Sequence, residues 1–509
     1  MGKTSDATIR ENHQDGSERL SSPQIKKNAE NQGKKERGYF IEFFAFALIG
    51  AFCILTVCYM DITVAPRFGV TLIDSLFDGE LLSFYHLSNI AGINAEGANY
   101  DMGYFIIYGI WDFPVWVLHH LFQIDTGNTW CLIWYKIPLL FFTFITARET
   151  VQVAKLCGIM KDSEREVLLL FLTTSVLFFP VMIACQCDII SVAFAMGATR
   201  LMMENRYRSG LLLFAVSMTV KPFTILWLAL CVAYQNRNLF KTIFDFACGC
   251  SLFLLSRGLY LLSPSHPGAR QRALTEDPAA LWSTTISVGN GEISLFFVVI
   301  VIVLIAAFAN RESLLEISGR RKLLVYLYVL WGAFLVVVGI VPYWAVYFAP
   351  VSVLVMCMAG SEAAMLMDLA VNVAFTAIMI MRFTWVYGGS RTFSYLLLKR
   401  FFVDEKMASD GITVSGFLTT LHMHHFVPVL FAIVAGGVIY IGYSAWKKYP
   451  ILGVIGYDKA QDRETPSGFD EDTVFYRSVR WEILLRLLFL YGFIALALAA
   501  MAATRIWKY

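Results

Sequence analysis

The chain has 509 residues, of which 57% are hydrophobic and only 16% are charged. Because soluble globular domains are about 45–50% apolar and about 25% charged, this composition excludes an ordinary soluble protein. The formal net charge is +2, and neither a basic stripe nor zinc-finger spacing is present, so the sequence predicts no nucleic-acid partner. The ten cysteines lie almost entirely in apolar segments and follow no disulfide-framework or zinc-ribbon pattern.

Apolar runs long enough to cross about 30 Å of hydrocarbon recur along the chain. The clearest are 39–60, 166–185, 291–309, 323–341, 426–445 and 483–503. Only α-helices satisfy every backbone group within such a run, and the alternating pattern of a membrane barrel is absent. The sequence therefore predicts an all-α, polytopic transmembrane helix bundle with about 11 to 13 spans.

The first 38 residues are polar, and their basic cluster Lys34, Lys35 and Arg37 directly precedes the first apolar run. We expect a disordered cytoplasmic tail followed by an uncleaved span. The following residues divide into two membrane modules. These are 39–310, with an outer segment at 61–129, and 311–509, with an outer segment at 386–425 and a cytoplasmic loop at 446–480.

Two stretches have more than one interpretation. Residues 104–122 are long enough to span the bilayer, but their aromatic residues, together with Asp112, favour an in-plane interfacial helix. Residues 211–234 are interrupted by Lys221–Pro222, which favours two short helices meeting at an outer turn. A single kinked span is the alternative for the second stretch.

Charged side chains at membrane depth cost roughly 2.5–3.5 kcal/mol each, so those that are present mark candidate sites. Asp61 follows the first span, where a carboxylate is suited to act as a general base or to hold a divalent cation such as Mg²⁺ or Mn²⁺. Capping of the helix end is the structural alternative for Asp61. Four further acids share its outer segment: Asp74, Asp78, Glu80 and Asp101.

Two more polar groups lie at predicted outer turns. Gln186 and Asp188 separate two apolar spans and could bind sugar hydroxyls, or form a simple polar turn. Lys221 interrupts an apolar stretch, where its ammonium could stabilise a phosphate leaving group or extend to the surface.

The remaining candidates are more peripheral. Tyr343 and Trp344 form an aromatic pair at an outer turn, and Arg382 and Arg391 lie where a phosphate could be contacted. The run His422-Met423-His424-His425 places His422 and His425 on one helix face, but no carboxylate completes a metal site there.

In this order, the motifs resemble integral-membrane glycosyltransferases of the GT-C superfamily. Similarity is greatest to bacterial polyprenyl-phosphate-dependent mannosyl- and arabinosyl-type transferases and to GPI mannosyltransferase I. Tyr59-Met60-Asp61-Ile62 matches the first part of the family's Y-x-D-[FI]-x-x-Y, and Gly79–Tyr85 matches G-x-x-x-x-[FY]-Y. The segment Tyr100–Tyr104 is a loose counterpart of an aromatic Y-P-P motif, without its prolines.

The second half of the resemblance covers the later turns. Cys185–Asp188 corresponds to G-Q-x-D with the glycine replaced. About 30 residues further on, Lys221–Pro222 matches the end of a G-x-x-x-x-x-K-P segment. Some relatives carry D-x-D at the first site, where this chain has Thr63 in the third position. The resemblance covers residues 39–240.

The resemblance implies an inverting transfer of a monosaccharide from a polyprenyl-phosphate sugar to a glycan or lipid acceptor on the non-cytoplasmic face. It implies Asp61 as the base, acting alone or with an acid further along, for which Asp101 is our candidate catalytic residue. Substrate contacts are implied for Gln186, Asp188, Lys221, Tyr343 and Arg391.

Two other function classes fit the same sequence. A transporter or lipid flippase would place ionisable residues on broken helices near mid-membrane. An oligosaccharide polymerase or ligase would use a lipid-diphosphate oligosaccharide. The chain ends without a retention signal, so we expect a bacterial plasma membrane rather than the endoplasmic reticulum.

Overall fold

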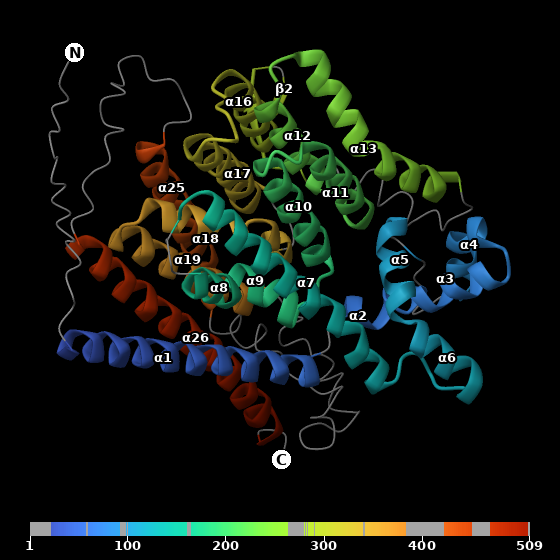
Figure 1. Ribbon diagram of the computed structural model, residues 1–509. Helices are drawn as coiled ribbons and strands as arrows, with labels where there is room; N and C mark the ends of the chain where they lie inside the picture. Colours follow the sequence, from blue (N-terminus) through green and yellow to red (C-terminus); the bar gives the residue numbers. More distant parts are fainter. Residues whose placement is uncertain are drawn as a thin grey trace, which may run out of the picture.

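The structure is a computed structural model. It describes residues 22–57, 60–91, 98, 100–159, 164–262, 279, 281, 283–289, 291–338, 342–382, 422–449 and 469–506. Almost all of these residues form helices that pack into one bundle (Figure 1). The all-α fold predicted from the apolar runs is confirmed.

The elements follow one another in three groups along the chain. The first group contains α1 (Ser22–Thr56), α2 (Met60–Val64), α3 (Phe68–Phe77), the short 3₁₀ helix η1 (Leu81–Ser83), α4 (Phe84–Ala91), α5 (Met102–Trp111), α6 (Phe113–Phe122) and α7 (Thr129–Leu156). The second contains α8 (Glu164–Thr173), α9 (Ser175–Phe178), the π-helix η2 (Phe179–Ile183), α10 (Asp188–Met203), α11 (Tyr207–Val220), α12 (Thr224–Gln235) and α13 (Leu239–Leu262). The third contains β1 (Thr285–Val288), β2 (Gly291–Ser294), α16 (Leu295–Ala309), α17 (Ile317–Val337), η4 (Pro342–Tyr347), α18 (Ala349–Ala359), α19 (Glu362–Arg382), η6 (Met423–Phe426), α25 (Val427–Lys448) and α26 (Phe469–Ile506).

Several helices are long and apolar enough to cross a membrane. The described residues contain five: Tyr39–Thr56, Thr129–Leu156, Leu239–Leu261, Glu362–Met381 and Met423–Lys448. The number rises to seven if each of two bent helix pairs counts as one span. Other predicted spans are shorter apolar helices, such as α16 and α18. The chain is therefore compatible with a multi-pass membrane protein.

Helix α10 forms the centre of the bundle, packed between α7 and α11. Every residue of α10 except Phe194 and Arg200 is buried. Gly210 on α11 allows the close approach of the two helices, because a Cβ there would lie 3.0 Å from the Ala198 carbonyl oxygen. Small residues permit such close packing between membrane helices.

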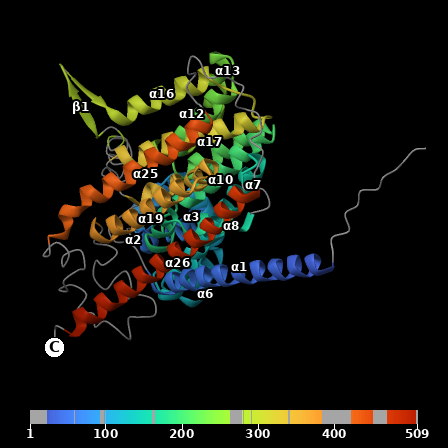
Figure 2. The same ribbon diagram turned by 90° about the vertical axis from the view of Figure 1, so that its left-hand side faces the viewer.

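The first and last helices lie against each other. Figures 1 and 2 both show α1 beside α26, and the two helices are in contact. Arg480 Nε donates to Glu42 Oε1 at 3.0 Å, and the Tyr491 hydroxyl donates to the Ala45 carbonyl oxygen at 2.6 Å. Parts of the chain that the sequence assigned to separate modules therefore pack together.

Helix α1 begins at Ser22, inside the segment that we predicted as a disordered tail. Residues 22–38 include four Lys, two Glu and two Gln, which are good helix formers, and an apolar helix follows them directly. Helix propagation from that apolar segment accounts for the difference.

Two predicted continuous helices are broken. The stretch 104–122 is two helices, α5 and α6, bent by 62° at Asp112, and Pro114 lies in the first turn of α6. The stretch 166–185 bends by 57° between α8 and α9 and continues as a π-helix that contains Pro180.

In contrast, the predicted break at Lys221–Pro222 is confirmed: Lys221 is extended, with φ −147° and ψ 128°, between α11 and α12. The residue before a proline is biased toward this conformation.

A β-hairpin was not predicted. Strands β1 and β2 pair antiparallel, and β2 occupies the start of the run 291–309, where we predicted only a helix (Figure 2). Gly289 has φ +56° at the turn, a backbone conformation that glycine adopts readily and that two-residue hairpin turns require. The hairpin is short and isolated, so its alternating pattern is weak in the sequence.

Candidate functional site

Asp61 lies in the first turn of α2, immediately after the end of α1. The buried Lys136 on α7 holds that end, because its ammonium donates to the carbonyl oxygens of Ile54, at 2.5 Å, and of Val57. The orphan carbonyl groups at a helix end need such donors. Lys136 therefore fixes where the chain turns toward Asp61, whose side chain is half-buried.

Gln186 reaches Asp61 from the turn after the π-helix. Its amide Nε2 donates to Asp61 Oδ2 at 2.6 Å and to the Ala184 carbonyl oxygen at 3.2 Å. The turn is tight: Cys185 has φ +51°, and the Gln186 backbone N–H donates to the Pro180 carbonyl oxygen at 2.9 Å. The structure thus brings together two of the residues predicted from the sequence, although 125 positions separate them.

Asp188 is the first residue of α10 and is fully buried. The Tyr347 hydroxyl donates to its Oδ1 at 2.8 Å and lies 3.2 Å from Ser191 Oγ. Among the described residues, Oδ2 of Asp188 has no hydrogen-bond partner. A buried carboxylate oxygen without a partner is costly, which favours a ligand donor at this position.

Lys221 lies beside an aromatic wall. Its Nζ is 4.5 Å from the ring centroid of Tyr100 and 5.9 Å from that of Trp344. Phe223 extends the wall, with its ring 4.4 Å from Trp344. Aromatic faces attract a cation at these distances, so the two rings help to hold the Lys221 ammonium in place.

Cys187 connects these groups. Burial raises the pKa of the Cys187 thiol well above its usual range; the nearby carboxylates of Asp188 and Asp61 raise it further, and the Lys221 ammonium lowers it. Tyr100 also shares a side-chain hydrogen bond with Cys187. Asp61, Asp188 and Lys221 therefore all lie within electrostatic reach of one side chain.

Asp101 borders this cluster on the side of Lys221. It precedes α5, is 3% exposed, and accepts a hydrogen bond from Arg257 Nη2 at 2.8 Å. Its Oδ1 has no hydrogen-bond partner within the described part of the chain. Burial raises the pKa of Asp101 to about 6, although Arg257 and Lys221 lower it.

The sequence analysis missed Arg257 because it lies within the apolar stretch of α13. A single cation in such a stretch is the signal that could have identified it. Tyr347 was missed for a different reason: a buried aromatic residue is ordinary in a core.

The other acids of the outer segment lie apart from this cluster. Asp74 accepts hydrogen bonds from Trp116 Nε1 at 2.6 Å and pairs with His120 at 2.9 Å. Asp78 and Glu80 are exposed on the surface. The five acids of this segment therefore do not form one group. Only Asp61 and Asp101 lie near the cluster around Cys187.

Three predicted contacts cannot be placed. Arg391 lies outside the described residues, as do the side chains of Tyr343 and Arg382. Trp344, the neighbour of Tyr343 on η4, is the residue whose ring faces Lys221.

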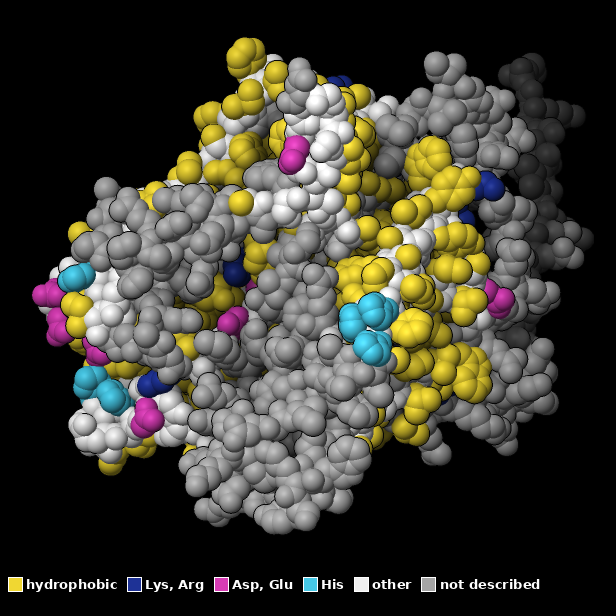
Figure 3. Space-filling view, turned by 180° about the vertical axis from the view of Figure 1, so that it is seen from behind, with side chains coloured by type: hydrophobic (Ala, Val, Ile, Leu, Met, Phe, Trp, Pro, Cys, Tyr) yellow, Lys and Arg dark blue, Asp and Glu magenta, His cyan; other side chains and the backbone are white. Residues whose placement is uncertain are grey.

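No group of three or more His, Cys, Asp or Glu side chains in the described ranges could hold a metal ion. His422, His424 and His425 cluster on the surface beside an apolar face (Figure 3). The rings of His424 and His425 are 4.1 Å apart, and those of His422 and His425 are 6.0 Å apart. His422 precedes the helix in a left-handed conformation, so the predicted shared helix face is wrong.

Comparisons with family models, with curated proteins and with solved structures find no match to this chain.

Proposed function

We propose that the protein is a GT-C-like glycosyltransferase that moves a monosaccharide from a polyprenyl-phosphate sugar to a hydroxyl acceptor on the non-cytoplasmic face. The observation that supports this most is the convergence around Cys187 of Asp61, Gln186, Asp188 and Lys221. The reaction needs a base for the acceptor and a cation for the leaving phosphate, and both are available in this cluster.

In this proposal Asp61 removes the proton from the acceptor hydroxyl. The half-buried Asp61 side chain is accessible, and the Gln186 amide holds Oδ2 so that the carboxylate keeps one orientation. The acceptor oxygen attacks the anomeric carbon, the bond from that carbon to the phosphate oxygen breaks, and the configuration inverts. Lys221 stabilises the negative charge that develops on the departing polyprenyl phosphate.

The remaining residues orient the sugar. Asp188 Oδ2 would accept a hydrogen bond from a sugar hydroxyl, and Tyr100 and Trp344 would pack against the apolar face of the ring. Asp101, our candidate for a second catalytic acid, is paired with Arg257. We therefore assign Asp101 to holding a second cation near Lys221.

A divalent cation fits this cluster poorly. Asp61 Oδ2 already accepts a hydrogen bond from Gln186, which a metal ion would displace. Nor does any trio of His, Cys, Asp or Glu close enough for coordination occur in the ranges that the structure describes. We route no step of the reaction through a metal.

Transport is the second candidate function, and one observation favours it. Two helix pairs are bent by more than 40°, and α11 and α12 meet at an extended Lys221. Discontinuous helices of this kind line substrate sites in many secondary transporters.

The deciding experiment uses purified protein in lipid nanodiscs and in sealed vesicles. Nanodiscs receive short-chain polyprenyl-phosphate sugars or polyprenyl-diphosphate sugars, and released lipid phosphate is measured. Release of polyprenyl monophosphate with a new glycosidic bond supports the proposal. Use of the diphosphate donor alone would indicate a polymerase or ligase, and movement across vesicles without bond formation would indicate a transporter.

A further inference from the structure

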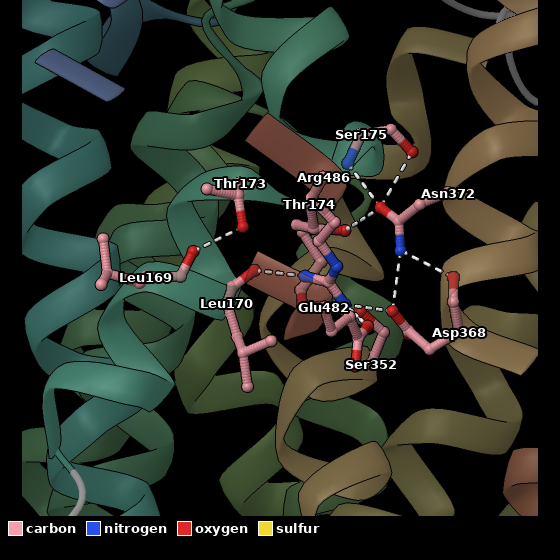
Figure 4. A network of polar contacts seen from close by, with 11 residues as sticks. Leu169, Leu170, Thr173, Thr174, Ser175, Ser352, Asp368, Asn372, Glu482 and Arg486 are labelled. Carbon is pink, nitrogen blue, oxygen red and sulfur yellow. Dashed lines mark hydrogen bonds and ion pairs between the residues drawn. The ribbon is translucent and has the colours of Figure 1, made fainter. Parts of the chain in front are cut away.

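A buried network of polar side chains surrounds the break between α8 and α9 (Figure 4). It joins three parts of the chain: the break itself, α19 and α26. Arg486 on α26 pairs with Asp368 on α19 and, at 2.6 Å, with Glu482 on its own helix. All three charged side chains are buried. Ionisable residues buried among apolar helices are rare and commonly serve a function.

The break leaves backbone groups without their helical partners. Thr174 is extended, with φ −67° and ψ 134°, so the regular hydrogen-bond ladder stops there. The N–H of Ser175 would otherwise bond within the helix, as would the carbonyl oxygen of Leu170. Such groups carry a free-energy cost when they are buried without a partner.

Side chains from the two C-terminal helices satisfy these groups. Asn372 Oδ1 accepts from Ser175 N at 2.7 Å and from the hydroxyls of Thr174 and Ser175 at 3.0 Å each. Arg486 Nη1 donates to the Leu170 carbonyl oxygen at 2.7 Å. Asn372 and Arg486 therefore cap the broken helix from outside.

A second layer fixes the orientation of these caps. Asn372 Nδ2 donates to Asp368 Oδ2 at 2.7 Å and to the Asp368 carbonyl oxygen at 2.8 Å. Asp368 in turn pairs with Arg486. Rotation of the Asn372 amide would break its hydrogen bonds both to Asp368 and to Ser175, so these contacts hold the amide in one orientation.

The break directs the chain toward the candidate site. After Thr174, α9 and η2 lead directly into the turn that carries Gln186, and Gln186 N donates back to the Pro180 carbonyl oxygen. Gln186 then contacts Asp61 at 2.6 Å. A straight helix from Glu164 would follow a different direction, because the observed bend is 57°.

We propose that Asn372, held by Asp368 and Arg486, is a positioning residue: it maintains the α8–α9 bend and thereby sets the Gln186–Asp61 contact. In this way α19 and α26 affect the geometry of the candidate site through the bend, although no described residue of either helix contacts the site. The catalytic part of this inference rests on the proposed sugar transfer, whereas its structural part does not.

The test compares Asn372→Leu, which keeps the branched shape of the side chain but removes the polar cap, with Thr376→Val. Thr376 is a matched control because it is buried one helical turn away and its hydroxyl bonds only to the Asn372 carbonyl oxygen among the described contacts. Hydrogen–deuterium exchange is followed for residues 175–188 and for α10. We expect Asn372→Leu to accelerate exchange selectively at 175–188, and Thr376→Val to leave it unchanged.

The kinetic arm measures turnover with the polyprenyl-phosphate donor. A displaced catalytic contact lowers kcat, and a 1 Å misplacement can cost about 100-fold. We expect Asn372→Leu to lower kcat by roughly that factor with little change in KM for the donor. Absence of turnover in the unmodified protein would contradict the proposed function, and the exchange arm would still decide whether Asn372 holds the bend.

A rescue variant separates positioning from general stability. Ser175 is the first residue of α9, where proline is tolerated, and the preceding Thr174 already has the extended conformation that proline imposes. The double variant Ser175→Pro/Asn372→Leu encodes the break locally, so we expect it to recover slow exchange and kcat. Equal exchange in Asn372→Leu and the unmodified protein, an equal effect of Thr376→Val, or failure of the rescue would overturn the inference.

Discussion

The amide of Gln186 donates a hydrogen bond to Oδ2 of Asp61 at 2.6 Å, joining the turn after the π-helix η2 to α2, the helix that follows α1. Gln186 is buried and Asp61 is half-buried, so the pair lies at the edge of the protein interior. In our proposal this contact orients the base of a sugar-transfer reaction. Four variants test the surrounding site.

Tyr347→Phe removes the only described donor to the buried Asp188. Asp188 then has no partner for either oxygen, and the expected loss is about 1–3 kcal/mol of unfolding free energy. Thermal unfolding followed by tryptophan fluorescence measures the loss. Tyr328→Phe is the control: its equally buried hydroxyl donates to the neutral Val438 carbonyl oxygen, so we expect about 1 kcal/mol. Equal losses in both variants would contradict the role of Tyr347.

Lys221→Met keeps the length of the side chain and removes the ammonium. Because a hydrogen bond to a charged group contributes about 1.5–3 kcal/mol, we expect kcat/KM for the polyprenyl-phosphate donor to fall by about 10- to 100-fold. Lys241→Met is matched, since Lys241 also lies over a tyrosine ring, Tyr207, at 5.8 Å. We expect donor kinetics of that variant to be unchanged. A similar kcat/KM for the donor in both variants would contradict the role of Lys221 in stabilising the leaving phosphate.

Asp101→Asn tests the raised pKa of Asp101. The pKa is about 6 in the folded protein against 3.8 ordinarily, so the folded state binds the proton more tightly. Stability contributed by this group is full below about pH 4 and is lost as the pH rises through 6. The unmodified protein should therefore lose thermal stability across this window, by up to about 3 kcal/mol. In Asp101→Asn that loss should be absent, and an identical pH profile would show that Asp101 does not titrate there.

Much of the fold follows from local patterns. The apolar runs required helices, and Pro222 required a break beside Lys221, as observed. The breaks at Asp112 and Thr174 were missed, although Pro114 and Pro180 lie close by. Proline is tolerated in the first turn of a helix, so the position of a proline alone does not show whether the preceding helix bends there.

The site was predictable only in part, because its contacts join distant segments. Asp61, Gln186, Asp188 and Lys221 were selected from motif order and predicted sidedness. Their partners, such as Tyr347 and Arg257, follow no local spacing. The network around Arg486 was not predicted, because Arg486 is a single charge inside the predicted apolar run 483–503. A single charged residue inside an apolar run is a signal that a buried polar partner lies nearby.

The most direct test of the account is the turnover of Asp61→Asn, with Asp78→Asn as its control. Asp78 lies in the same outer segment but is exposed and apart from the cluster. Both variants are assayed for release of polyprenyl phosphate and formation of a glycosidic bond, and their thermal unfolding is compared. We expect Asp61→Asn to lose at least about 100-fold in kcat, as for a missing general base, with Asp78→Asn unchanged. Full sugar transfer by a folded Asp61→Asn protein would contradict the proposed mechanism.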